Sequence, residues 1–289
     1  MIMLPLLRGG NAAPLTRELL EVLGRLIGQV PWGIKIRTAR LGGVPVDIVS
    51  PRRLSPPASI MYLHGGAYVS GSPRSYRRLV SRLADVTGCR IVAVDYRLAP
   101  ENPYPAALDD SIAVYKGLLA DYPPSANLFI AGDSAGGGLA LATALALRDG
   151  GLRLPAGLVC IAPWIDLTCS GDSMRTRSRR ERMMTPSGLA TDARHYASTQ
   201  SLENPFISPL FADLGGLPPL MIQVGDDEVL LDDATRLAMA AMSQQVSVTM
   251  QIWPHLWHVW HLYAGLMPEA DAAIRAIADF LSNQMGSGC

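Results

Sequence analysis

The sequence predicts an α/β fold: one domain built on an open, twisted, mostly parallel β-sheet with helices on both faces. Short apolar or β-branched runs alternate with longer helical stretches along most of the chain. These helical stretches are long enough for right-handed crossovers between parallel strands. Because 289 residues can bury one large core, we expect a single domain over residues 1–289.

We expect strands at residues 44–49, 59–63, 90–94, 128–131, 158–161, 220–224 and 246–252. The helices that cover the sheet are expected at residues 75–87, 106–120, 135–148, 232–243 and 270–282. Asp232 or Asp233 fits the N-cap of the fourth helix. The last strand could form an exposed edge that pairs with a second copy, so a homodimer is one expectation.

Two segments lie outside this alternation. Leucines and isoleucine at helical spacing predict an amphipathic helix over residues 15–27. The pattern breaks over residues 166–205, where five arginines gather between positions 175 and 182. Because an insertion of this length is usually functional, and most often a lid, we expect cap elements from residues 1–40 and from about 166–205.

The composition excludes several classes of protein. With 25 basic and 25 acidic residues, the chain has no net field to attract nucleic acid. Its four cysteines form neither a C-x-x-C pair nor a dense framework, so we expect neither zinc nor a disulfide scaffold. The apolar stretch in the first eight residues is too short for the core of a signal peptide, and a proline interrupts it. The sequence has no run of 18 apolar residues. We therefore expect a cytoplasmic protein without a membrane span.

A strand, a sharp turn and a helix are predicted around Ser134. The apolar run at 128–131 leads into Gly-Asp-Ser-Ala-Gly at 132–136, and an alanine- and leucine-rich stretch follows. Glycines on both sides permit a strained turn, and we expect it to leave the Ser134 hydroxyl exposed above the sheet and not buried. No strand is followed by the Gly-Lys-Ser/Thr or G-x-G-x-x-G pattern of a phosphate-binding loop. The G-x-S-x-G pattern therefore predicts a nucleophilic serine.

An earlier predicted strand ends in two glycines, Gly65 and Gly66. Acyl transfer places negative charge on a carbonyl oxygen, and preorganised backbone N–H groups stabilise that charge. We expect an oxyanion hole made by the N–H groups of Gly65, Gly66 and Ala135. His64, which precedes the glycines, is given a structural role in orienting the loop.

Four histidines follow the serine and could act as its general base. His195 lies in the irregular insertion, whereas His255, His258 and His261 follow the last predicted strand. Histidines three and six positions apart spread too widely on a helix for one metal ion, and no cysteine or nearby carboxylate completes a site, so we expect no metal. His258 is the predicted base, and His255 is the second choice.

The carboxylate that orients this base is expected in the loop after residues 220–224, because the chain order is serine, acid, histidine in enzymes with this serine turn. Residues 225–233 contain five carboxylates. The residues by themselves leave Asp226, Asp227 and Glu228 open.

Several ordered motifs make the chain resemble the hormone-sensitive-lipase family of esterases, also called bacterial lipolytic family IV, which has the α/β-hydrolase fold. They are His-Gly-Gly-Ala at 64–67, Asp-Tyr-Arg-Leu-Ala-Pro-Glu at 95–101, Gly-Asp-Ser-Ala-Gly-Gly at 132–137, Ser-Pro-Leu at 208–210 and His-Val-Trp at 258–260. The resemblance implies an eight-stranded sheet with a helical cap. It also implies a serine carboxylesterase that hydrolyses short- to medium-chain esters through an acyl-enzyme, without a cofactor.

The resemblance also narrows the choice of acid. Similar proteins commonly carry Asp-Pro-Leu-x-Asp at the acid position, and residues 228–232 match that spacing. It therefore points to Glu228, with Asp227 as the alternative acid. The third glycine of the family's His-Gly-Gly-Gly loop is Ala67 here, which puts the geometry of a third loop donor in question.

Two rival functions use the same scaffold. Receptors that resemble this family bind small molecules without catalysis, but they lose the histidine that this chain keeps at His258. An amidase or peptidase would use the same catalytic groups as an esterase. We expect a small-molecule ester as the partner.

Overall fold

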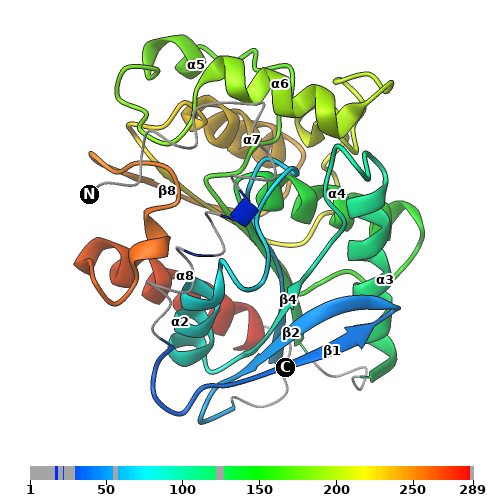
Figure 1. Cartoon of the computed structure of the whole chain (residues 1–289), viewed down its shortest axis with the longest axis vertical. Coiled ribbons are helices and arrows are strands. Elements are labelled where there is room, and N and C mark those ends of the chain that lie inside the picture. The colour runs from blue at the N-terminus through cyan, green and yellow to red at the C-terminus, as the bar shows by residue number, and fades with distance from the viewer. Residues whose placement is uncertain (1–16, 19–21, 23–29, 55–57, 122–126, 287–289) are drawn as a thin grey trace.

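The computed structural model describes residues 17–18, 22, 30–54, 58–121 and 127–286 (Figure 1). Its eight strands form one sheet in the order β1-β2-β4-β3-β5-β6-β7-β8. The strands are β1 (Lys35–Leu41), β2 (Val44–Ser50), β3 (Ala58–Leu63), β4 (Arg90–Val94), β5 (Asn127–Asp133), β6 (Gly157–Ile161), β7 (Leu220–Gly225) and β8 (Val248–Trp253). The predicted fold class is confirmed, and all seven predicted strands are present.

The sheet is parallel from β4 to β8, while β2 pairs antiparallel with both β1 and β4. Strands β3, β5, β6 and β7 are buried almost throughout, which explains why each is encoded by a continuous apolar run. Strand β1 was not predicted because its exposed and half-buried residues carry no such run. Strand β8 lies at the sheet edge, as predicted.

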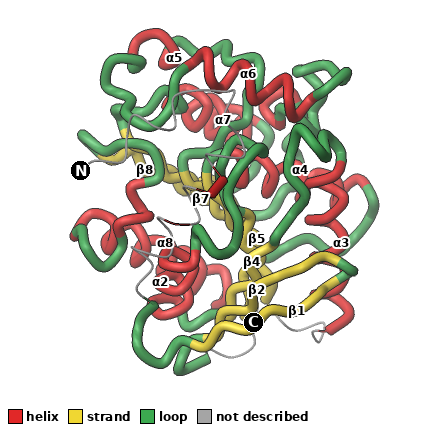
Figure 2. Tube along the Cα trace, viewed as in Figure 1, coloured by secondary structure: helices red, strands yellow, loops and turns green. Residues whose placement is uncertain are grey.

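Helices cover both faces of the sheet (Figure 2). The core on one face joins the sheet to α2 (Arg77–Thr87) and α8 (Pro268–Gly286). The core on the other face joins it to α3 (Ala106–Asp121), α4 (Ala135–Asp149) and α7 (Leu231–Ser243). Because the parallel strands end at one edge, the loops after β3, β5 and β7 meet there.

The insertion over residues 166–205 contains α5 (Ser173–Thr176) and α6 (Pro186–Ala197). Both helices lie at the end of the molecule drawn at the top of Figure 1. Helix α6 begins where the Thr185 hydroxyl accepts the Gly188 N–H at 3.1 Å. Its Tyr196 ring stacks on Tyr68 with centroids 3.6 Å apart, so the insertion packs against the loop that follows β3.

The N-terminal helix predicted over residues 15–27 lies almost wholly outside the described residues. Arg17, which is described, donates from its guanidinium to the carbonyl groups of Val69 and Ala99 and pairs with Glu101 at 2.9 Å. No helix in the described ranges is long and apolar enough to cross a membrane.

The predicted capping role of Asp232 and Asp233 is wrong. Leu230 is the N-cap of α7, without a side-chain hydrogen bond. Asp233 instead accepts the N–H groups of Ile165 and Asp166, both at 2.9 Å, and Asp232 accepts that of Ser173 at 2.8 Å. The first turn of α7 therefore holds the start of the insertion in place.

Candidate active site

Ser134 occupies a strained turn between β5 and α4. Its φ of 53° and ψ of −125° lie outside the regions that L-residues favour. Two hydrogen bonds hold it there: its N–H donates to Ile161 at 2.8 Å, and its carbonyl accepts the Trp164 N–H at 3.0 Å. A side chain at Gly136 would collide with the Leu63 carbonyl, so the turn requires glycine at this position.

The Ser134 side chain lies at the N-terminus of the 15-residue helix α4, as the sequence predicted. Its exposure was not predicted correctly, because only 4% of the residue is accessible. The candidate nucleophile therefore lies inside a largely enclosed site, where water screens charges less than at the surface.

The loop after β3 lies against this turn and supplies backbone donors. Gly65, which the sequence predicted as an oxyanion donor, donates its N–H to the buried Asp133 carboxylate at 3.0 Å in this structure. Among the described residues, none accepts a hydrogen bond from the N–H groups of Gly66, Ala67 or Ala135. These three N–H groups are therefore the candidates for a developing oxyanion.

His64 orients this loop through its ring. Its Nδ1 lies 2.8 Å from the Gly65 carbonyl, which can only accept, so Nδ1 carries the proton. Burial lowers the pKa of His64 to about 4, which keeps the ring neutral. The ring stacks on Tyr96, whose hydroxyl donates to the His64 carbonyl at 2.6 Å. The proposed structural role of His64 agrees with this geometry.

His258 and Glu228 form a buried hydrogen-bonded pair. His258 Nδ1 lies 2.7 Å from Glu228 Oε2, and Glu228 Oε1 accepts the Gly225 N–H at 2.7 Å. Burial by itself would lower the pKa of His258, but the charge and hydrogen bond of Glu228, together with the charges of Glu181 and Asp133, outweigh burial and raise it. Glu228 thus fixes the Nδ1 proton and leaves Nε2 free to accept one.

The alternative acid and the second-choice base lie away from this pair. Asp227 forms an ion pair with Arg180 at 3.2 Å. His255 is exposed, and its N–H donates to Asp226 at 2.6 Å. The geometry therefore favours Glu228 and His258 over Asp227 and His255.

The three clustered histidines take different partners. Nε2 of His261 donates to the Gln223 side chain at 2.8 Å, and burial lowers the pKa of His261 to about 3. His255 does have carboxylates beside it, because atoms of Asp226, Asp227 and His255 lie within 4.8 Å of one another. The sequence argument that no carboxylate lies near these histidines is wrong for His255. Both aspartates already have protein partners, and the expectation of no metal stays a prediction.

Sequence reasoning missed two buried carboxylates near the site. Glu181 appeared only as one member of an arginine-rich segment, but its side chain is buried and accepts the N–H groups of Arg182 and Met183 at 2.8 Å. It also accepts the Val229 N–H at 3.4 Å, next to Glu228. Asp133 is the second, and its position directly before Ser134 was the available signal.

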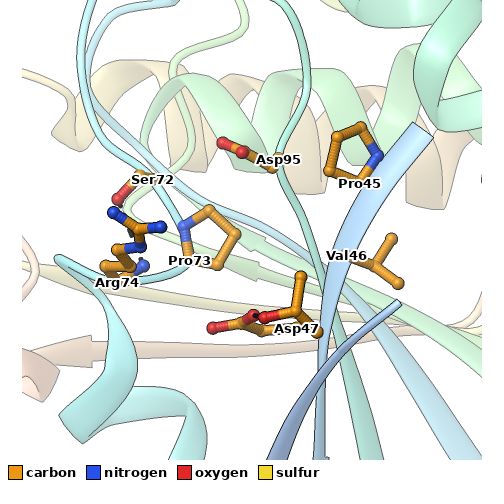
Figure 3. A pocket seen from close by; sticks show the side chains of 8 residues that line it. Pro45, Val46, Asp47, Ser72, Pro73, Arg74 and Asp95 are labelled. Atoms are coloured by element: carbon orange, nitrogen blue, oxygen red, sulfur yellow. Dashed lines mark hydrogen bonds between the residues drawn. The ribbon is translucent and has the colours of Figure 1, made fainter. Parts of the chain in front are cut away.

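A separate pocket of about 240 Å³ lies between the β1–β2 hairpin and residues 72–74, which follow the loop after β3. Its lining includes Asp47, Asp95 and Arg74 (Figure 3). None of the candidate catalytic residues lines it. This pocket is therefore distinct from the site around Ser134. The carboxylate of Asp47 is already hydrogen-bonded to Thr38 at 2.8 Å and to Arg77 at 3.0 Å.

Comparison with known proteins places the chain in a class. A family model described as alpha/beta hydrolase fold matches residues 60–262, and the chain belongs to this family. It is 46% identical over 230 residues to an acetyl-hydrolase of Streptomyces hygroscopicus, covering 80% of this chain and 77% of that protein. It is 36% identical over 276 residues to an esterase of Acinetobacter venetianus, covering 94% and 90%.

A solved structure gives a more particular likeness. The crystal structure of an esterase from the bacterial hormone-sensitive lipase family superposes with a TM-score of 0.91 at 39% identity, covering 94% of this chain and 92% of that one. The resemblance to that family, which the motifs indicated, is confirmed.

Exchanging the two candidate acids separately tests the pairing. Glu228→Gln leaves His258 without an anion, so we expect kcat to fall by about 10³- to 10⁴-fold. The pKa of His258 should also fall, moving the acid limb of the kcat/KM profile to lower pH. The matched variant Asp227→Asn should keep kcat within about threefold. Equal losses in the two variants, measured by steady-state kinetics, would contradict the assignment.

Proposed function

We propose that this protein is a serine carboxylesterase that hydrolyses short- to medium-chain esters through a Ser134–His258–Glu228 triad. The activity class rests on its relatives, which are named acetyl-hydrolase and esterase. The observation that carries the triad is the buried 2.7 Å contact between His258 and Glu228, at the sheet edge where β5 presents Ser134 in its strained turn.

In the first half-reaction, the Ser134 hydroxyl attacks the ester carbonyl while His258 Nε2 takes its proton. The carbonyl oxygen becomes an oxyanion, which the N–H groups of Gly66, Ala67 and Ala135 stabilise. His258 then protonates the leaving alkoxide, the bond to the alcohol breaks and the acyl group remains on Ser134. The Glu228 carboxylate stabilises the imidazolium that forms in between.

In the second half-reaction, water attacks the acyl-enzyme. His258 takes a proton from the water, and a second oxyanion forms against the same N–H groups. When this intermediate collapses, His258 returns the proton to Ser134 and the carboxylic acid leaves. Protein groups supply every proton transfer, so the mechanism that we propose uses no cofactor or metal.

Other aspects of the proposal come from the sequence. That the chain acts as one domain, and that its insertion at about 166–205 forms a cap over the site, stay predictions. Of the second expected cap element, residues 1–40, positions 35–40 belong instead to the edge strand β1, and most of the remainder lies outside the described residues. A homodimer through the edge strand β8, a cytoplasmic location and the lack of nucleic-acid partners stay predictions. An amidase with the same triad is the competing activity, and matched ester and amide substrates separate the two.

Replacing the nucleophile tests the mechanism directly. Ser134→Ala removes the only group that can carry the acyl chain, so we expect kcat for p-nitrophenyl butyrate to fall by roughly 10⁶-fold. The melting temperature should not fall, because alanine fits the same space. Activity near that of the wild type would refute the role of Ser134.

A series of p-nitrophenyl esters from two to sixteen acyl carbons tests the substrate class. We expect kcat/KM to be highest for short and medium chains and to fall by at least about tenfold at sixteen carbons, because an enclosed site limits acyl length. A maximum at the longest chains would contradict the proposal.

A further inference from the structure

Asp133 is a fully buried carboxylate that the proposed mechanism does not use. It ends β5 and directly precedes Ser134. Three groups donate hydrogen bonds to it: the Tyr62 hydroxyl at 2.7 Å, the Tyr76 hydroxyl at 2.8 Å and the Gly65 N–H at 3.0 Å. An ionised carboxylate accepts all three, because each of its oxygens has two lone pairs.

These donors come from separate parts of the fold. Tyr62 lies in β3, Gly65 in the loop that follows β3, and Tyr76 at the start of α2. One side chain therefore ties the strand that carries Ser134 to the loop that carries the candidate oxyanion donors. A buried carboxylate is costly unless its oxygens are satisfied, so this arrangement is rigid.

Gly65 is packed directly against this carboxylate. A Cβ at Gly65 would collide with the Asp133 side chain and would also approach the Tyr76 hydroxyl to 2.8 Å. The glycine is thus required by the close approach of Asp133, independently of the hydrogen bond from its N–H. The hydrogen bond and the close packing at Gly65 both show that Asp133 holds this loop in position.

The contacts of Gly65 also determine the orientation of the next peptide unit, which carries a candidate oxyanion donor. Asp133 holds the Gly65 N–H, and His64 holds the Gly65 carbonyl at 2.8 Å. The Gly65 carbonyl and the Gly66 N–H belong to one planar peptide unit and point in opposite directions. Fixing Gly65 on both sides therefore fixes the direction in which the Gly66 N–H points.

We propose that Asp133 is the positioning residue of the oxyanion hole: its ionised carboxylate holds Gly65 so that the Gly66 N–H points at the substrate oxyanion beside Ser134. This inference rests on the proposed esterase mechanism and adds a residue to it. Asp133 touches neither substrate nor reacting atoms, so it acts through Gly65. A misplacement of about 1 Å at a reacting centre can lower the rate by about 100-fold.

Protonation of Asp133 would weaken this support. Burial raises the pKa of Asp133 to about 6, although its hydrogen bonds with Tyr62 and Tyr76 and the charge of His258 lower it. Tyr62, Tyr76 and Tyr96 face the carboxylate and have raised pKa values, mainly through burial, so they stay protonated. Below a pH of about 6, the carboxyl group gains a proton, which occupies one lone pair and removes the negative charge that strengthens the three hydrogen bonds.

The first test compares Asp133→Asn with the wild type. We expect kcat to fall by about 10- to 100-fold with KM within about twofold, because the donors act on the transition state. The inhibition constant of a trifluoromethyl ketone, whose hemiketal oxyanion occupies the same hole, should rise by a similar factor. The acid limb of kcat/KM should move to lower pH, since the Asp133 charge no longer raises the pKa of His258.

Stability separates this role from a purely structural one. Burial raises the folded-state pKa of Asp133 from its ordinary value of 3.8 to about 6, so the folded protein favours the protonated carboxyl group. The contribution of this group to the free energy of unfolding is therefore present at low pH and is lost as the pH rises through about 6. Asp133→Asn should therefore melt no lower than the wild type at pH 8 while losing activity. Unchanged kcat and an unchanged ketone inhibition constant would overturn the proposal.

A second variant predicts a shift of opposite sign. Tyr76→Phe removes a hydrogen bond that lowers the pKa of Asp133, so its acid limb should move to higher pH. The matched control is Tyr115→Phe, because Tyr115 is also a buried tyrosine, and its hydroxyl has no partner among the described residues. Shifts of the same sign in Asp133→Asn and Tyr76→Phe would overturn the proposal. Failure of the esterase mechanism itself would instead appear as an active Ser134→Ala variant.

Discussion

The strained turn at Ser134 is the constraint on which the rest of the site depends. A residue in this backbone conformation costs about 1–3 kcal/mol, so surrounding contacts must hold it. Strand β6 does so through the Ile161 carbonyl, and the following segment through the Trp164 N–H. The turn also brings Gly136 against the Leu63 carbonyl at the end of β3. The loop that begins there is thereby placed beside the serine, which is where acyl transfer needs its donors.

Around this turn the protein buries several charges at once. Glu228, Asp133 and Glu181 have almost no exposed surface, and the charges of all three raise the pKa of His258. Each carboxylate accepts at least one backbone N–H group, which offsets part of the cost of removing it from water. These anions therefore favour the imidazolium form of His258, which the proposed mechanism requires. They also link the proposed triad to the insertion through Glu181 and to the loop after β3 through Asp133.

Much of this arrangement could be predicted from the chain, because periodicity and glycine placement are local signals. The buried strands, the serine turn and the position of His258 after β8 are of this kind. The directions of hydrogen bonds are not local: the Gly65 N–H turns to Asp133, and Asp233 binds the segment after β6 instead of capping α7. The residues by themselves also left Asp226, Asp227 and Glu228 open, and only the resemblance to a family motif pointed to Glu228. The choice depends on which side chain points inward from the loop after β7.

The central claim is that Ser134, activated by His258 and facing the loop donors, carries the acyl group. Diethyl p-nitrophenyl phosphate tests it most directly, because its phosphoryl group reacts with an activated serine and mimics the tetrahedral intermediate. Intact-mass and peptide mass spectrometry should find one diethylphosphoryl group per chain, on the peptide that contains Ser134, with activity lost in proportion. Labelling on another residue, or complete labelling with activity retained, would contradict the account.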